Sequence, residues 1–153
     1  MEFLLHHLTI KTPLLISTDG SKGSRWGGGS WITFLHNGTH ITSGYKPNFG
    51  QLRQINSYRA EIYASLSASI FLYHYAKYFM IEIGNDFLAI YDNLAFVNKL
   101  SWLLKDDYNN HAFHKSMEQE TFHLILQILS KAFTIEHVKG HQDNYRSYKD
   151  LIN

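Results

Sequence analysis

Three acidic residues stand where side chains from different parts of an α/β chain can meet. Asp19 follows the short apolar run "LLIST", and Asp92 follows a second one, "FLAIY". Glu61 lies in the first two turns of a long helical segment. Sites in α/β sheets form at strand ends and at neighbouring helix starts. Converging carboxylates repel one another unless a hard divalent cation neutralises them, so these residues predict a metal site.

The ligand types restrict the metal. The chain has no cysteine, and carboxylate oxygens suit Mg²⁺ or Mn²⁺. Two such ions about 3.5 to 4 Å apart can promote in-line phosphoryl transfer, because one activates the attacking water and the other stabilises the leaving oxygen. A zinc site among the ten histidines is disfavoured, since the chain has no HExxH motif and no thiolate ligands.

The first half of the chain predicts three strands in an antiparallel meander. Asp19 ends the first strand, and Asn37-Gly38 is typical of a two-residue hairpin turn. The strands are expected at 14–19, within 28–38 and at 39–45.

The second half alternates helices with strands. A long helix is expected at 56–79, with Asn56 or Ser57 as its N-cap. Its apolar face is expected to contain Tyr63, Leu66 (or Ser67), Ile70 and Tyr73 or His74, and its aromatic stretch "FLYHYAKYF" is expected to pack on the sheet. A buried strand ending at Asp92, helices at 94–100 and 115–132, and a strand from residue 133 follow. Crossover helices make the later strands parallel, so the pattern predicts an α/β fold.

Composition sets wider limits. A chain of 153 residues with 44% hydrophobic residues is expected to form one domain, 1–153. The formal charge of +1 gives no strong field, so any nucleic-acid surface must come from locally clustered basic residues. No signal peptide and no membrane-spanning run is recognised in the sequence. We therefore expect a soluble intracellular protein, cytoplasmic or nuclear, without a membrane partner.

Four short motifs occur in a characteristic order: "TDGS", "SYRAE", "YDN" and "HVKGHQDN". Together they resemble ribonuclease H of type 1, in the form found in retroelement reverse-transcriptase polyproteins. The resemblance extends from about residue 14 to the end of the chain. It implies a five-stranded mixed sheet, three strands antiparallel and then two parallel, flanked by helices.

The resemblance also implies roles for individual residues. Asp19, Glu61 and Asp92 match catalytic carboxylates that bind Mg²⁺ or Mn²⁺, two ions in an intact site. His141 matches a mobile-loop histidine that helps to move protons and release product. The implied reaction is metal-dependent endonucleolytic hydrolysis of the RNA strand of RNA–DNA hybrids. The hybrid is the expected partner, and an earlier fusion to a reverse transcriptase domain is implied.

Substrate contacts follow from the same resemblance. A hybrid is recognised in its wide minor groove, where 2′-hydroxyls distinguish RNA from DNA. The glycines after Asp19 are expected to leave room for a nucleic-acid backbone. The predicted substrate-binding residues are Gly20, Ser21, Lys22, Ser57, Tyr58 and Asn93. The candidates for phosphate contacts, which are sensitive to salt, are Lys22, Arg25, Lys46, Arg53 and Arg59.

The chain also departs from the pattern. The family's fourth carboxylate lies in an "NxxAD"-like stretch on a last helix, and this chain ends at "YRSYKDLIN". Asp143 and Asp150 do not match that carboxylate by position, and Ser57 and Tyr58 replace paired asparagines. The sequence thus predicts a domain without its last helix and with impaired activity. The alternatives are a catalytically inactive ribonuclease H-like nucleic-acid-binding or relic domain and, less favoured, a transposase or integrase-type nuclease.

Each acid also has a simpler interpretation. Asp19 is followed by glycine, as in many turns. Glu61 could favour the helix dipole, and Asp92 could cap the next helix.

Overall fold

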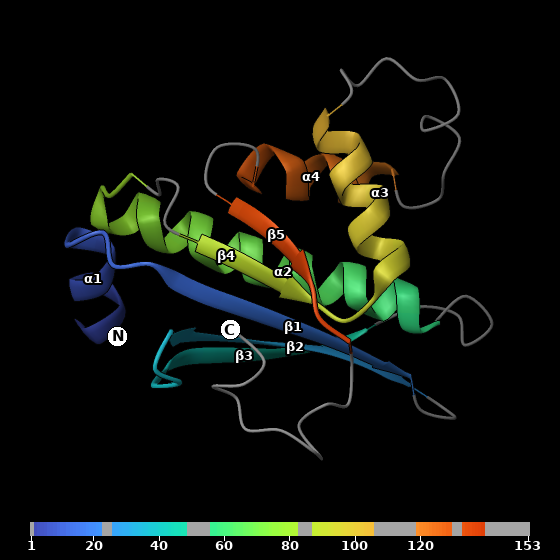
Figure 1. The fold of residues 1–153 in the computed structure, drawn as a ribbon, viewed down its shortest axis with the longest axis horizontal. Helices are drawn as coiled ribbons and strands as arrows, with labels where there is room; N and C mark the ends of the chain where they lie inside the picture. Colours follow the sequence, from blue (N-terminus) through green and yellow to red (C-terminus); the bar gives the residue numbers. More distant parts are fainter. Residues whose placement is uncertain are drawn as a thin grey trace.

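The computed structural model describes residues 2–22, 26–48, 56–82, 87–105, 119–129 and 133–139, and it places a long helix across a mixed sheet (Figure 1). The elements, in chain order, are α1 (Glu2–Thr9), β1 (Leu14–Lys22), β2 (Gly27–Leu35), β3 (His40–Asn48), α2 (Ser57–Phe79), β4 (Phe87–Tyr91), α3 (Leu94–Lys105), α4 (Gln119–Leu129) and β5 (Phe133–His137).

The sheet has five strands in the order β3-β2-β1-β4-β5. The three N-terminal strands are antiparallel, and β4 pairs in parallel with β1 and with β5. This arrangement confirms the predicted fold class. Within the described residues, no helix combines the length and the apolar character needed to cross a membrane.

β1 continues beyond the end predicted for it. It pairs with β4 only from Leu14 to Ser17, but it pairs with β2 as far as Lys22. Asp19 is therefore two residues past the last β4 partner and still inside the hairpin. The sequence motif marks the end of the parallel pairing, and the strand itself ends three residues later.

The turn between β2 and β3 also differs from its prediction. Four residues, 36–39, connect the strands instead of two, although Gly38 does take a positive φ of 85°. The side-chain oxygen of Asn37 accepts a hydrogen bond from the Thr39 backbone nitrogen at 2.9 Å. This local bond stabilises a wider turn, and the pairing register shifts next to it, between Thr33 and Phe34.

α2 begins where predicted. The Asn56 side chain caps it by accepting from the Arg59 backbone nitrogen at 2.7 Å. Its buried face contains a repeat of small residues four positions apart, Ala60, Ala64 and Ala68, continued by Leu72 and Ala76. Small side chains let the helix axis approach the sheet closely.

The predicted aromatic face of α2 was wrong in part. Ile70 is 37% exposed and Tyr73 is 48% exposed, because they project from the side of the helix opposite the alanine repeat. From the aromatic stretch, Tyr75 is buried, and Phe71 and Phe79 pack partly against the core.

The remaining elements complete the main core. α1 was not predicted, yet Leu4 and Leu8 bury against the same cluster as α2. α3 runs to Lys105, beyond its predicted end. α4 lies within the predicted range of 115–132, and the rest of that range is outside the described residues. A smaller apolar cluster on the other face of the sheet is formed by Leu15, Phe34 and Ile90.

Candidate metal centre

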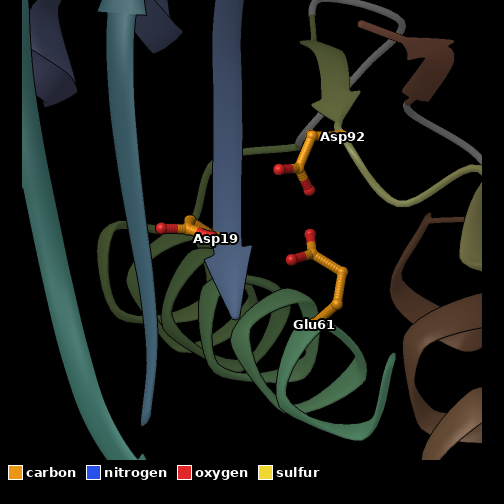
Figure 2. A group of neighbouring side chains, drawn as sticks. All are labelled: Asp19, Glu61 and Asp92. Carbon is orange, nitrogen blue, oxygen red and sulfur yellow. The ribbon is translucent and has the colours of Figure 1, made fainter. Parts of the chain in front are cut away.

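The side chains of Asp19, Glu61 and Asp92 converge beside the end of the parallel pairing. One carboxylate oxygen from each lies within 4.8 Å of the others. Figure 2 shows Glu61 reaching from α2 toward Asp92, with Asp19 beside them on β1. Glu61 is only 1% exposed, whereas both aspartates are exposed. The structure therefore brings together the three acids that the sequence singled out.

Strand geometry explains the positions of the two aspartates. Asp92 follows Tyr91, the last residue of β4, while Asp19 lies two residues past Ser17, the last β1 residue paired with β4. Parallel neighbours end at the same edge of a sheet, so both side chains reach one place. The cap of α3 is Asn93, whose side-chain oxygen accepts from the Phe96 backbone nitrogen at 3.0 Å. The capping role considered for Asp92 thus belongs to its neighbour.

Glu61 is fixed by two donors from β1. The Thr18 hydroxyl donates to one carboxylate oxygen, and the Gly20 backbone N–H donates to the other at 2.8 Å. Thr18 is not among the predicted site residues. Strand alternation could have identified it, because residues 18 and 20 face α2 when Asp19 faces away. An interaction with the helix dipole alone would not explain these two hydrogen bonds to β1.

Burial raises the pKa of Glu61 from 4.5 to about 8. The Thr18 hydrogen bond opposes this rise, the Asp92 charge adds to it, and the Asp19 charge adds less. This raised pKa favours the protonated form of Glu61 at neutral pH when no metal is bound. A divalent cation would compensate both the burial and the repulsion, and three carboxylates form a hard oxygen donor set. These residues could hold a hard divalent cation.

Two glycines of the first hairpin, Gly20 and Gly29, lie directly against α2. A Cβ on Gly20 would overlap the Glu61 backbone nitrogen and the Ala60 carbonyl carbon. A Cβ on Gly29 would lie 2.8 Å from the Cβ of Ala64. At these two positions the absence of a side chain allows α2 to pack closely against the sheet. The prediction that these glycines leave room for a nucleic-acid backbone is therefore wrong at Gly20 and Gly29.

The Gly20→Ala substitution should therefore destabilise the protein. We expect a loss of about 2–3 kcal/mol or more, because the overlap is with backbone that can move only with α2. Thermal or urea unfolding measures this loss. Gly38→Ala is the matched control, since it has a positive φ but nothing within 4 Å. Equal losses at the two glycines would show that α2 does not restrict Gly20.

The predicted substrate-binding residues surround the carboxylates. Ser21 and Lys22 are exposed at the end of β1, and Ser57 is exposed at the start of α2. Tyr58 packs partly against the core, and Asn93 is half-buried and caps α3. None of these positions tests a contact with substrate, so the contacts stay predictions.

Only some of the basic residues predicted to contact phosphates lie within the described part of the chain. Lys46 is exposed on β3, and Arg59 is half-buried near the start of α2. Arg25, Arg53 and His141 lie outside the described residues, as do Asp143 and Asp150.

A further histidine lies beside the site. The ring nitrogen Nε2 of His137, at the end of β5, is 3.1 Å from the backbone oxygen of Asp92. This contact links the ends of β4 and β5 next to the carboxylates.

Comparison with known proteins supports the fold. No protein-family model and no curated protein matches the sequence. Ribonuclease H1 from the halophilic archaeon Halobacterium salinarum is similar in structure, with a TM-score of 0.58 and 16% identity over 86% of this chain and 89% of that one. LC11-RNase H1 from compost, solved with an RNA/DNA hybrid, has a TM-score of 0.62 and 15% identity over 90% and 92%.

A viral structure shows the same likeness. The foamy viral protease-reverse transcriptase, solved with an RNA/DNA hybrid, gives a TM-score of 0.63 and 14% identity over 94% of this chain and 19% of that one. At these identities the likeness shows the fold. The chain has the ribonuclease H fold, as its four motifs predicted.

Proposed function

We propose that this protein is a metal-dependent endonuclease that hydrolyses the RNA strand of RNA–DNA hybrids. One observation carries the proposal: the carboxylates of Asp19, Glu61 and Asp92 meet within 4.8 Å on a ribonuclease H fold. Similar structures were solved as complexes with RNA/DNA hybrids, which supports the substrate class.

The three acids would hold Mg²⁺ or Mn²⁺ in this proposal. When bound, such ions activate a water and stabilise charge on the leaving oxygen of a phosphodiester. Asp19 and Asp92 are exposed and would face the substrate, while Glu61 is buried behind them. Thr18 and the Gly20 N–H hold Glu61 in one orientation, so one ligand is positioned before any cation or substrate arrives. The predicted proton-moving role of His141 is kept as part of the proposal.

Substrate recognition would involve the two chain segments beside the acids. Ser21 and Lys22 extend from β1, and Ser57 stands at the start of α2. Lys22 and Lys46 would contact phosphates, a contribution that weakens as salt increases.

The test is a cleavage assay on end-labelled substrates. We expect internal cuts in the RNA strand of a hybrid with Mg²⁺ or Mn²⁺, and no cuts after chelation. Duplex DNA of the same sequence should stay intact. A chain that binds the hybrid but cuts it with neither metal would contradict the proposal and favour the inactive binding domain.

A further inference from the structure

A groove of about 560 Å³ opens on the sheet face opposite α2. Strand alternation assigns its walls: Thr18 and Gly20 face α2, so Ser17 and Asp19 face the other way. Asp19 pairs with Ser30 on β2, and Ser30 pairs with Tyr45 on β3. The groove thus begins at the carboxylate centre and crosses β2 toward β3. The side chains that line this face are Ser17, Asp19, Ser30, Ile32, Ser43 and Tyr45.

Tyr45 forms the far wall of the groove. A Cβ added to Gly28 would lie 2.8 Å from both Cε2 and the hydroxyl oxygen of Tyr45, so the ring lies against the Gly28 backbone. The side chain is nevertheless 61% exposed. A bare glycine thus supports one side of an aromatic ring that remains open to solvent. Exposed aromatic rings of this kind provide stacking surfaces for nucleobases.

The rest of the groove offers hydroxyl groups. Ser17 and Ser43 can each donate and accept hydrogen bonds, as contacts to phosphate oxygens and sugar hydroxyls require. The Ser30 hydroxyl donates to the Asp19 backbone oxygen at 3.5 Å, and its own oxygen can still accept a hydrogen bond. Among the lining residues, Asp19 alone is charged, and it lies at the end where a cation would neutralise it. The volume falls within the range of roughly 300–1,000 Å³ typical of small-ligand sites, which suits a single nucleotide.

We propose that this groove is a subsite for one unpaired nucleotide of the substrate, at a frayed end or single-stranded extension of the hybrid, in which Tyr45 stacks on the base and the serine hydroxyls bind its sugar and phosphate. The inference rests on the proposed function, because it places one nucleotide of the cleaved hybrid next to Asp19. It adds a specific positioning residue, Tyr45, that no sequence motif identified.

The test compares Tyr45→Ala with Tyr45→Phe. Hybrid affinity is measured in Ca²⁺, which supplies a divalent charge with looser coordination geometry than Mg²⁺. Losing one stacked base costs about 1–3 kcal/mol, so we expect Tyr45→Ala to raise Kd and KM about 5- to 150-fold. kcat should change little, and Tyr45→Phe should behave as the unsubstituted protein because it keeps the ring. Tyr78→Ala, which removes an exposed tyrosine on α2, is the matched control.

A spectroscopic signature identifies the stacked base. 2-Aminopurine is placed at successive positions of the hybrid, and its fluorescence should be quenched at one position by the protein but not by Tyr45→Ala. Unchanged Kd, KM and quenching in Tyr45→Ala would overturn the subsite. Equal weakening by Tyr45→Phe would overturn stacking as its basis. If the unsubstituted protein never cleaves but Tyr45→Ala still weakens binding, the proposed function fails and the subsite stands.

Discussion

Replacing Asp19 with asparagine should reduce hybrid cleavage by about 10²- to 10³-fold or more, the scale expected when a group that stabilises charge at a reacting centre is lost. Asparagine keeps the size of the side chain but removes the negative charge that would hold a cation. Asp19 is exposed, so the substitution should leave the melting temperature nearly unchanged. Single-turnover cleavage at saturating enzyme measures the effect without a contribution from product release.

Two comparisons make this result specific. Glu120→Gln removes an exposed acid on α4 and should cleave normally, which controls for a general loss of negative charge. Asp92→Asn should be impaired like Asp19→Asn, since both aspartates belong to the same cluster. Cleavage by Asp19→Asn within a few-fold of the unsubstituted protein would separate the carboxylate cluster from the reaction.

Much of this site could be predicted because its acids lie at element boundaries. A strand end is visible in the sequence as an apolar run that stops, as before Asp19 and Asp92. A helix start is visible through its cap, here Asn56, which places Glu61 in the second turn. The sequence therefore indicated which residues would converge, because parallel strands end at one edge.

Contacts across the sheet could not be read in the same way. That Thr18 donates to Glu61, and that Gly28 supports Tyr45, depends on which residues become neighbours when β1, β2 and α2 pack together. The sequence pattern of the glycine-rich hairpin predicts room for substrate, whereas in the structure the missing side chain of Gly20 makes room for α2. Which face of α2 is buried also depends on tertiary packing, because the alanine face faces the sheet only once the distance between helix and sheet is set. α1 has only eight residues, too few for a clear periodicity.

The pH dependence of stability should reveal the unusual environment of Glu61. Its pKa is about 8 in the folded protein and close to 4.5 when unfolded, so the folded state binds more protons between these values. The free energy of unfolding of the metal-free protein should therefore be highest at low pH within this window and fall as pH rises through 8. The interval from 4.5 to about 8 sets an upper limit of about 5 kcal/mol on this loss.

Glu61→Gln isolates this effect from the titration of the ten histidines. The glutamine oxygen can accept from the Gly20 N–H, and its amide can donate to the Thr18 hydroxyl oxygen, so both contacts survive without an ionisable group. Urea unfolding in chelator at pH 5.5, 7 and 8.5 should show a steeper loss for the unsubstituted protein than for Glu61→Gln. Parallel curves would mean that Glu61 does not titrate in this window.

A divalent metal should oppose the loss of stability at high pH, because the cation takes the place of the proton on Glu61. A cation that binds only the folded state adds about 2.7 kcal/mol at a concentration a hundredfold above its Kd. Mg²⁺ or Mn²⁺ should therefore stabilise the unsubstituted protein most at pH 8.5, where Glu61 is ionised and its repulsion with Asp92 is greatest. The gain should shrink toward pH 5.5, where the cation must displace the proton, and it should be smaller in Glu61→Gln at every pH. A stabilisation independent of pH and equal in both proteins would place the metal elsewhere in the chain.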